Sequence, residues 1–275
     1  MYKKEAKDKL IDYEKQMRID ELSDNTIKKY LFDIEQWLEH QNMYIDMESM
    51  IEYKKLLVQM YSASSVNSKL ISVNRYLKWI RHGELVLKTK RLQQRTSVEN
   101  IISKNEYNRM LEFAKKTNRN KMYYILRTIA LTGIRIGELK YITVDAVNTG
   151  WAEVYNKGKY RNIYISRNLS EELLNYCNDN GISTGIVFRG RNREEGISPA
   201  GVWKNMKYIA EQVGVPLEKV YPHNLRHLFA KTYMEKVGDV TELSDLLGHS
   251  RLETTWIYTK TTAEEKRNRL EKLDL

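Results

Sequence analysis

The sequence predicts a mainly α-helical protein with a small β-sheet, in which a helical N-terminal domain precedes a larger mixed domain. The chain has 275 residues, enough for two domains of ordinary size. Its first glycine is Gly83 and its first proline is Pro199, so residues 1–82 contain neither of the strong chain breakers. Beyond about residue 99, alternating aromatic and β-branched runs flank a glycine-containing turn, a pattern typical of a hairpin.

Residues 1–87 are expected to form the helical domain, as a bundle of four or five helices over about residues 3–82. Its clearest stripe recurs at helical spacing and comprises Ile27, Tyr30, Leu31, Ile34, Trp37 and Leu38, with Ser23 or Asp24 as the N-cap. A later stripe comprises Val66, Leu70, Val73, Leu77 and Ile80. Apolar residues at 10–17 and 51–60 indicate two further helices. Each stripe is interpreted as a core-facing surface.

Residues 88–98 are predicted to be a basic linker. The segment carries Lys88, Lys90, Arg91 and Arg95 without an acidic residue up to position 95. A solvated linker would have this composition, but the whole chain has a formal net charge of +10. Excess lysine and arginine attract polyanions, and phosphate contacts are the usual source of such affinity. These four cations are therefore candidate DNA-binding residues.

Residues 99–275 form the second expected domain. Its predicted helices lie at 103–117, 119–132, 135–142, 169–179, 199–213, 222–236, 240–247 and 261–273. The runs at 151–156 and 161–166 predict a β-hairpin whose turn holds Lys157, Gly158 and Lys159. A further short strand is predicted at 186–188. Pro222 suits the first position of a helix.

Several classes of protein are disfavoured by the composition. Cys177 is the one cysteine in the sequence, so neither an internal disulfide nor a cysteine-based zinc site is expected. No apolar run reaches the roughly 18 residues of a membrane span, and the N-terminus lacks the apolar segment of a secretory signal. A cytoplasmic protein without a membrane partner is the expectation.

Two clusters of candidate catalytic residues lie in the first half of the second domain. Arg135 follows Gly133 among small and apolar residues, and Glu138 lies three positions later, where it could orient the arginine. Alternatively the two form a structural ion pair. The hairpin turn places Lys157, Lys159 and Arg161 near its tip, either as surface cations or, for a lysine of lowered pKa, as a proton donor. Lys159 and Arg161 are also candidate DNA-binding residues.

Two more clusters lie near the C-terminus. His223 and Arg226 are three residues apart at a predicted helix start, where the helix N-terminus favours an anion. His227 lies four residues from His223, which leaves a metal pair open, although no third ligand of good spacing is evident. His249 follows a Leu-Gly pair, and Tyr258 lies nine residues further on.

Taken together, these residues can exchange a phosphodiester for a phosphotyrosine. A tyrosine hydroxyl can attack phosphorus, and arginine forks match the charge that builds on the non-bridging oxygens. A lysine can protonate the departing 5′ hydroxyl. No metal or other cofactor is required by this chemistry.

At this point the sequence resembles the tyrosine recombinase (phage integrase) family, and its size is closest to the Xer-type and simple integrases. The resemblance rests on four boxes in order: the run Thr132–Leu139 around Arg135, the Lys157 turn, His223–His227, and Leu247–His249 followed by Thr254–Tyr258. It implies a SAM-like core-binding domain over 1–87 and a tyrosine recombinase catalytic domain over 99–275.

The resemblance also implies a function and roles. Tyr258 would be the nucleophile, Arg135 and Arg226 would clamp the phosphate, Lys157 would be the general acid, and His223 and His249 would assist. The enzyme would act on double-stranded DNA with core sites as a homotetramer, through a 3′-phosphotyrosine and a Holliday junction, with accessory proteins in some systems. The C-terminal helix, with Leu270, Leu273 and Leu275, would pack into a neighbouring subunit. A type IB topoisomerase and a non-catalytic DNA-binding protein of the same fold are the alternatives.

Overall fold

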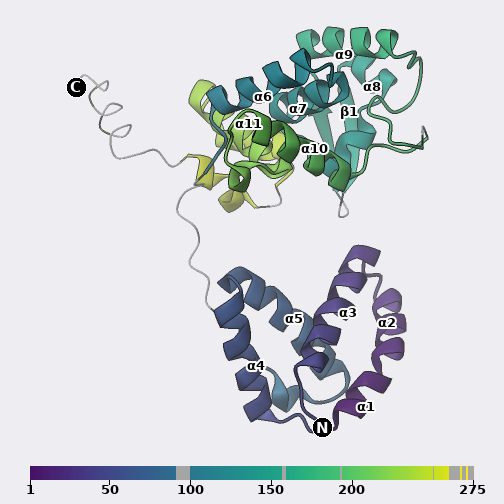
Figure 1. Cartoon of the computed structure of the whole chain (residues 1–275), viewed down its shortest axis with the longest axis vertical. Coiled ribbons are helices and arrows are strands. Elements are labelled where there is room, and N and C mark those ends of the chain that lie inside the picture. Colours follow the sequence, from purple (N-terminus) through teal and green to yellow (C-terminus); the bar gives the residue numbers. More distant parts are fainter. Residues whose placement is uncertain are drawn as a thin grey trace. The chain divides into compact units, whose positions relative to one another are not determined.

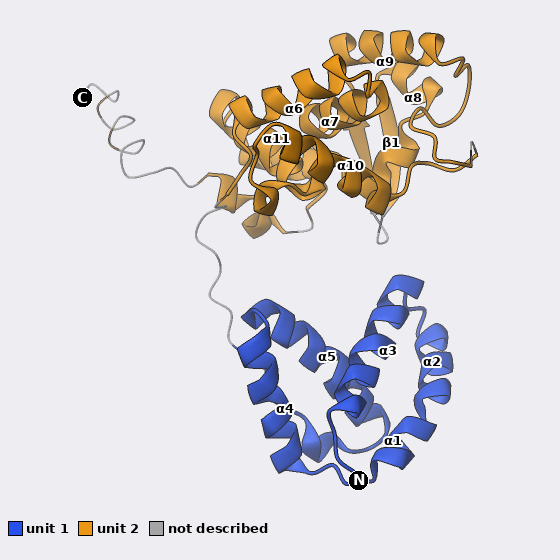
Figure 2. Cartoon of the chain, in the orientation of Figure 1, with its two compact units in different colours: residues 1–94 blue, residues 95–275 orange. Residues whose placement is uncertain are grey.

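The computed structural model describes residues 1–90, 100–156, 159–192, 194–249 and 251–259, together with Arg267 and Glu271. The chain divides into two compact units, Met1–Gln94 and Arg95–Leu275 (Figure 2). Each unit has its own hydrophobic core. Within the described ranges, no helix combines the length and apolarity that a membrane crossing needs. Six residues of the sequence predictions lie outside the described residues: Arg91, Arg95, Lys157, Leu270, Leu273 and Leu275.

The first unit is a bundle of helices, as the sequence predicts. Its described elements are α1 (Lys3–Asp8), α2 (Leu10–Ile19), α3 (Asp24–Glu39), α4 (Met47–Met60), α5 (Ala63–Trp79) and the 3-10 helix η1 (Gly83–Leu85) (Figure 1). Polar side chains cap three of them: the Ser23 hydroxyl accepts from the Thr26 N–H, and Asp46 and Ser62 do the same for α4 and α5. The predicted cap of α3 at Ser23 is confirmed.

The apolar stripes predicted for α3 and α5 face the core of this unit. Ile34 and Trp37 of α3 and Leu70 and Tyr76 of α5 are fully buried, and the two helices pack against each other. A buried acid joins the same helices, because Asp33 of α3 pairs with Lys69 of α5 and accepts a hydrogen bond from Ser72. Burying such a carboxylate without partners would be costly, so these contacts help fix how α3 and α5 meet.

Two asparagines of α5 fasten the chain that leaves the first unit. The Asn74 side chain binds both the N–H and the carbonyl of Leu87, and Asn67 binds those of Lys90 in the same way. The side chains of Lys88 and Lys90 are exposed. The backbone is therefore held while these two cations stay free to meet a polyanion.

The second unit is mainly helical with one two-stranded sheet. Its described elements are α6 (Lys104–Lys116), α7 (Asn120–Thr132), η2 (Ile136–Tyr141), α8 (Val144–Thr149), β1 (Trp151–Asn156), β2 (Lys159–Tyr164), α9 (Arg167–Asp179), α10 (Pro199–Gln212), η3 (Leu217–Lys219), α11 (Pro222–Lys236), α12 (Val240–Leu247), η4 (Leu252–Thr254) and η5 (Trp256–Tyr258). The predicted helix over 261–273 lies outside the described residues except for Arg267 and Glu271, which are helical and ion-paired at 3.3 Å.

Three sequence expectations need correction in this unit. The helix predicted over 135–142 is the 3-10 helix η2, and its first turn is capped by the Glu138 carboxylate, which accepts from the Arg135 N–H. Residues 186–188 do not form a strand: Ile186 makes an isolated bridge with Thr143, and Val187 and Phe188 are buried. The short helix α8, which Thr143 caps and Gly150 ends, was not predicted.

The predicted hairpin is present, with its second strand two residues earlier than expected. β1 and β2 pair antiparallel, with Trp151 opposite Tyr164 and Tyr155 opposite Tyr160. One face of the sheet packs inward through Ala152, Val154 and Ile163, which are buried. The aromatic residues of the other face are exposed.

Helix α7 is the central support of the second unit. Ile125, Leu126 and Ile129 are fully buried, and α6, α9, α10 and α11 all contact this helix (Figure 1). Helix α7 ends at Gly133, which has a left-handed backbone with φ of 63°. The chain therefore turns sharply just before Arg135, and the predicted active-site arginine follows a rigid, buried helix.

Candidate active site

Three arginines from distant parts of the sequence meet at the C-terminal end of α12. Arg161 Nη1 donates to the carbonyl of Leu246 at 2.6 Å, and Arg135 Nη2 donates to that of Gly248 at 3.2 Å. Arg226 Nη2 donates to the intervening carbonyl of Leu247. Consecutive carbonyl groups thus each hold a different guanidinium.

The end of a helix is suited to this arrangement. The last carbonyls of an α-helix have no partner within it, and the helix dipole gives this end a partial negative charge. Gly248 ends α12 with a left-handed backbone of φ 60°. Arg226 also donates from Nη1 to the Gly133 carbonyl at 2.7 Å, so it joins the ends of α7 and α12. Its side chain is almost fully buried, at 4% exposure.

A methyl group at position 248 should disrupt this cluster. A Cβ added to Gly248 would lie 2.3 Å from Cδ of Arg161, and the left-handed backbone would be strained as well. We expect Gly248→Ala to lower the free energy of unfolding by about 1–3 kcal/mol, measured by urea denaturation. Gly137→Ala is the matched control, because nothing lies within 4 Å of its added Cβ. Equal stability of both variants would contradict the expectation.

Glu138 is the buried carboxylate of the cluster. It accepts from Arg135 Nη1 at 3.0 Å, from the Arg135 N–H at 2.9 Å, and from Arg161. Burial alone would raise the pKa of Glu138, but Arg161 and Arg135 hold it below its ordinary value. The carboxylate is therefore ionised and orients two guanidinium groups, as the sequence predicts for Arg135.

The side chain of Arg161 has partners that the sequence does not predict. The sequence places Arg161 near the hairpin tip with Lys159, as a DNA-binding cation. Its side chain is 9% exposed and is bound to Glu138 and to the end of α12. Residue 161 belongs to the inward face of β2, since it pairs with the buried Val154. Alternation along the strand thus turns Arg161 into the cluster and away from the tip.

The three histidines near the cluster differ in their partners. His249 Nδ1 lies 2.8 Å from the Thr255 hydroxyl. His227 Nδ1 is hydrogen-bonded to the Tyr258 hydroxyl. His223 is exposed at the start of α11 and lines the cleft described below. His227 thus faces a tyrosine, and no group of three or more possible metal ligands occurs in the described part of the chain.

Burial and nearby positive charge keep these imidazoles neutral. Burial first, and then His223 and Arg226, lower the pKa of His227 to about 4. Burial and the surrounding arginines lower the pKa of His249 to about 4 as well. Burial raises the pKa of Tyr258 to about 12, against the opposing effect of Arg226. The tyrosine is therefore protonated and its hydroxyl donates to His227.

These shifts predict a loss of stability in mild acid. A histidine in the unfolded chain has a pKa near 6.5, so between about pH 6.5 and 4 the unfolded state binds more protons than the folded state. Stability therefore decreases as pH falls through this window. We expect the unfolding temperature to drop by on the order of 5 °C, measured by circular dichroism.

The origin of that slope can be checked by substitution. The double variant His227→Asn, His249→Asn should flatten it, whereas His40→Asn, at an exposed histidine that ends α3, should leave it unchanged. An unaltered slope in the double variant would assign the acid sensitivity to other groups.

A cleft opens beside the arginine cluster. It has a volume of about 1230 Å³ and is lined by Arg135, Tyr160, Arg161, Asn162, Tyr164, His223, Glu242, Ser244, Asp245, Leu246, Gly248, His249 and Thr254. The arginine cluster, with three guanidinium groups and the Glu138 carboxylate, carries excess positive charge, while Glu242 and Asp245 also line the cleft. A cleft of this kind suits a bound anion, and a phosphate fits the arginine forks.

The structure thus brings together most of the predicted site residues. Arg135, His223 and His249 line the cleft, and Arg226 is anchored directly behind them. Lys157 lies outside the described residues. His227 was missed as a site residue, although its position four residues after His223 signalled a shared helix face.

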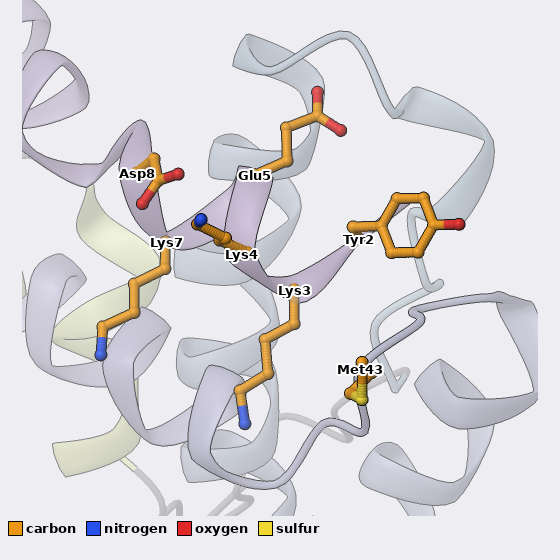
Figure 3. A pocket seen from close by; sticks show the side chains of 7 residues that line it. All are labelled: Tyr2, Lys3, Lys4, Glu5, Lys7, Asp8 and Met43. Carbon is orange, nitrogen blue, oxygen red and sulfur yellow. The ribbon is translucent and has the colours of Figure 1, made fainter.

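The first unit has a smaller hollow of a different kind. It is lined by Tyr2, Lys3, Lys4, Glu5, Lys7, Asp8 and Met43 (Figure 3). Several of its groups are already paired: Glu5 binds Lys9, and Lys3 donates to the Gln41 carbonyl. The Tyr2 ring packs edge-on against Tyr44. Its lysines therefore share the hollow with two carboxylates, and no arginine lines it, unlike the cleft of the second unit.

Comparison with known sequences identifies relatives along nearly the whole chain. The sequence model of the phage integrase family matches residues 100–265, more than half of the chain. Tyrosine recombinase XerA of Pyrococcus furiosus is 28% identical over 92% of this chain and 89% of its own. Tyrosine recombinase XerD of Vibrio cholerae is 27% identical, covering 88% of each chain.

Solved structures have the same fold. A lambda integrase (75–356) dimer bound to a COC′ core site superposes with a TM-score of 0.73 at 16% identity, covering 92% of this chain and 95% of that one. XerH site-specific recombinase, bound to its difH substrate before cleavage, superposes with a TM-score of 0.68 at 18% identity, covering 91% and 79%. The mainly helical fold with its small sheet is therefore as predicted.

Proposed function

The chain belongs to the phage integrase family and is a tyrosine site-specific recombinase, and from this premise we propose that Tyr258 attacks DNA to form a 3′-phosphotyrosine. The observation that carries the proposal is the arginine cluster at the end of α12, with the Tyr258 hydroxyl held by the neighbouring α11. A buried, positively charged cluster beside a tyrosine provides both a phosphate site and a nucleophile.

The arginines would stabilise the transition state. Arg135 and Arg226 are held rigidly by main-chain carbonyls, so they need no reorganisation when a phosphate enters. Hydrogen-bond donors that are fixed where negative charge develops in the transition state each commonly accelerate the reaction by about 10²–10³-fold. Glu138 keeps Arg135 oriented from behind. Arg161 also lines the cleft and joins this set as an additional positively charged group, so its proposed contact with DNA is to the phosphate in the cleft.

The remaining roles concern protons and phosphate contacts. Lys157 is proposed as the general acid for the leaving 5′ hydroxyl. His249, next to the arginines, would donate a hydrogen bond to the phosphate from Nε2, because its Nδ1 is engaged with Thr255. His223 lines the cleft and would assist there.

The proposed partner is double-stranded DNA carrying core recombination sites. Relatives of the same fold are described as bound to a core site and to a difH substrate, which supports this proposal. Residues 1–87 would be the core-binding domain, and the exposed Lys88 and Lys90 would follow the DNA backbone. A homotetramer on two synapsed sites, with strands exchanged through a Holliday junction, is the proposed assembly.

The proposal is tested with DNA that traps the covalent complex. A binding site is selected from a random duplex pool, a nick is placed beside the scissile phosphate so that the cleaved end diffuses away, and the adduct is mapped by mass spectrometry. We expect the adduct on Tyr258. An adduct on another residue, or none on DNA shown to be bound, would overturn the assignment.

A further inference from the structure

The hydroxyl of Tyr258 has a specific partner that the roles above do not use. Tyr258 lies in η5 and packs against the small cluster of Ala230, Leu243 and Leu247. Its hydroxyl meets Nδ1 of His227 on α11, and the two rings are 5.6 Å apart at 46°. Apolar packing thus places the ring, while one imidazole nitrogen receives the hydroxyl.

The direction of this hydrogen bond follows from the charges around it. His227 is buried on α11 close to the positively charged Arg226, so protonation of His227 is unfavourable. The same holds for His249, which lies nearby after α12. A neutral His227 presents a free lone pair at Nδ1 when the proton sits on Nε2. Because Tyr258 is protonated, its O–H donates to that lone pair. The pair is oriented as a donor and a proton acceptor.

A protonated tyrosine is a poor nucleophile and must lose its proton as it attacks. Among the described groups, His249 is committed to Thr255 through Nδ1, and His223 faces the cleft. We propose that His227 Nδ1 accepts the proton of the Tyr258 hydroxyl as the tyrosine attacks DNA. This inference rests on the proposed function of Tyr258.

The bound substrate itself would strengthen this base. The pKa of His227 is lowered mainly by burial, and in part by the nearby positive charge that includes Arg226. A phosphodiester anion held by the arginines would offset that positive charge, and so raise the affinity of His227 for a proton when it is needed. The free enzyme keeps the tyrosine protonated, and the substrate activates it.

The proton balance of the step is complete. The Tyr258 oxygen forms a bond to phosphorus, the bond from phosphorus to the 5′ oxygen breaks, and the tyrosine proton moves to His227. The departing 5′ oxygen takes its proton from the general acid, which is proposed to be Lys157. On rejoining, the 5′ hydroxyl attacks phosphorus and His227 returns its proton to Tyr258.

The test separates the nucleophile's proton from that of the leaving group. Adduct formation is measured on the trapping DNA and on the same DNA with sulfur replacing the 5′ bridging oxygen, because a thiolate leaves without a proton donor. We expect His227→Ala to slow cleavage by about 10²-fold or more on both DNAs, with DNA binding unchanged. Lys157→Ala should be slow on the oxygen DNA and recover on the sulfur DNA.

Two further variants separate proton transfer from placement of the ring. His227→Asn can accept the hydroxyl hydrogen bond but cannot carry the proton, so it should be as slow as His227→Ala and should lose the acid limb of the pH–rate profile. Tyr233→Phe is the matched control, since it removes a hydroxyl hydrogen bond to Glu242 next to the same cluster. It should cleave at the wild-type rate.

Each outcome has one meaning. If the cleavage rate of His227→Ala recovers on sulfur DNA, His227 acts on the leaving group and the proposal is overturned. If His227→Asn cleaves at the wild-type rate, His227 only positions the tyrosine, which overturns the proposal as well. If wild-type protein forms no adduct at Tyr258, the proposed function fails instead. His227→Asn retains a polar side chain and keeps the test usable if His227→Ala does not fold.

Discussion

Replacing Tyr258 by phenylalanine should abolish covalent attachment to DNA and leave DNA binding intact. The substitution removes one hydroxyl and keeps the ring that packs against Ala230, Leu243 and Leu247. The lost hydrogen bond to His227 should cost only about 1 kcal/mol of stability. Because no other group would replace the missing nucleophile, the expected loss of adduct is complete.

The measurement is a denaturing gel of the protein with trapping DNA, beside a binding titration on the same DNA. Tyr233→Phe serves again as the control, because it tests whether loss of a neighbouring tyrosine hydroxyl is enough to impair cleavage. Residual adduct in Tyr258→Phe at the wild-type rate would show that another side chain attacks phosphorus. Loss of binding in the same variant would show that Tyr258 is needed for the fold.

Several residues of this site could be predicted from the sequence because they lie in short boxes with a local physical signature. Gly133 before Arg135 predicted a sharp helix end, and Pro222 predicted the start of the helix that carries His223 and Arg226; both are confirmed. The helical stripes of the first unit were predictable for the same reason, since they depend on spacing within one element.

Apart from the pairing of Arg135 with Glu138, the contacts that hold the site together could not be predicted, because they join residues far apart in the chain. Arg161 and Glu138 are 23 residues apart, and Arg135 reaches a carbonyl 113 residues away. Nothing near Arg161 in the sequence distinguishes it from a surface cation of the hairpin. Its inward position depends on strand register, and the predicted strand began two residues too late.

His227 illustrates the same limit. Its spacing from His223 indicated a shared helix face, which suggested a metal pair as one possibility. The structure instead turns its Nδ1 toward Tyr258, a residue 31 positions away in a separate 3-10 helix. Periodicity shows which residues share a face, but the partner of that face is decided by packing between elements.

Replacing Arg226 by lysine should impair both catalysis and folding, although the charge is kept. Arg226 uses its two terminal nitrogens to bind the carbonyls of Gly133 and Leu247, which end two different helices. A single ammonium group cannot span both acceptors with the same geometry. We expect adduct formation to slow by on the order of 10²–10³ and the free energy of unfolding to fall by about 1–3 kcal/mol.

The control for this variant replaces another arginine of the same unit that also makes two side-chain hydrogen bonds through its guanidinium group. Arg127→Lys does so, because Arg127 holds Glu172 through two hydrogen bonds of 2.7 and 2.6 Å on a more exposed surface. Single-turnover adduct formation and urea unfolding should both be nearly unchanged in that variant. If Arg226→Lys cleaves DNA as fast as Arg127→Lys, positive charge alone suffices at position 226. The joining of α7 and α12 by its guanidinium would then matter for folding and not for the chemistry.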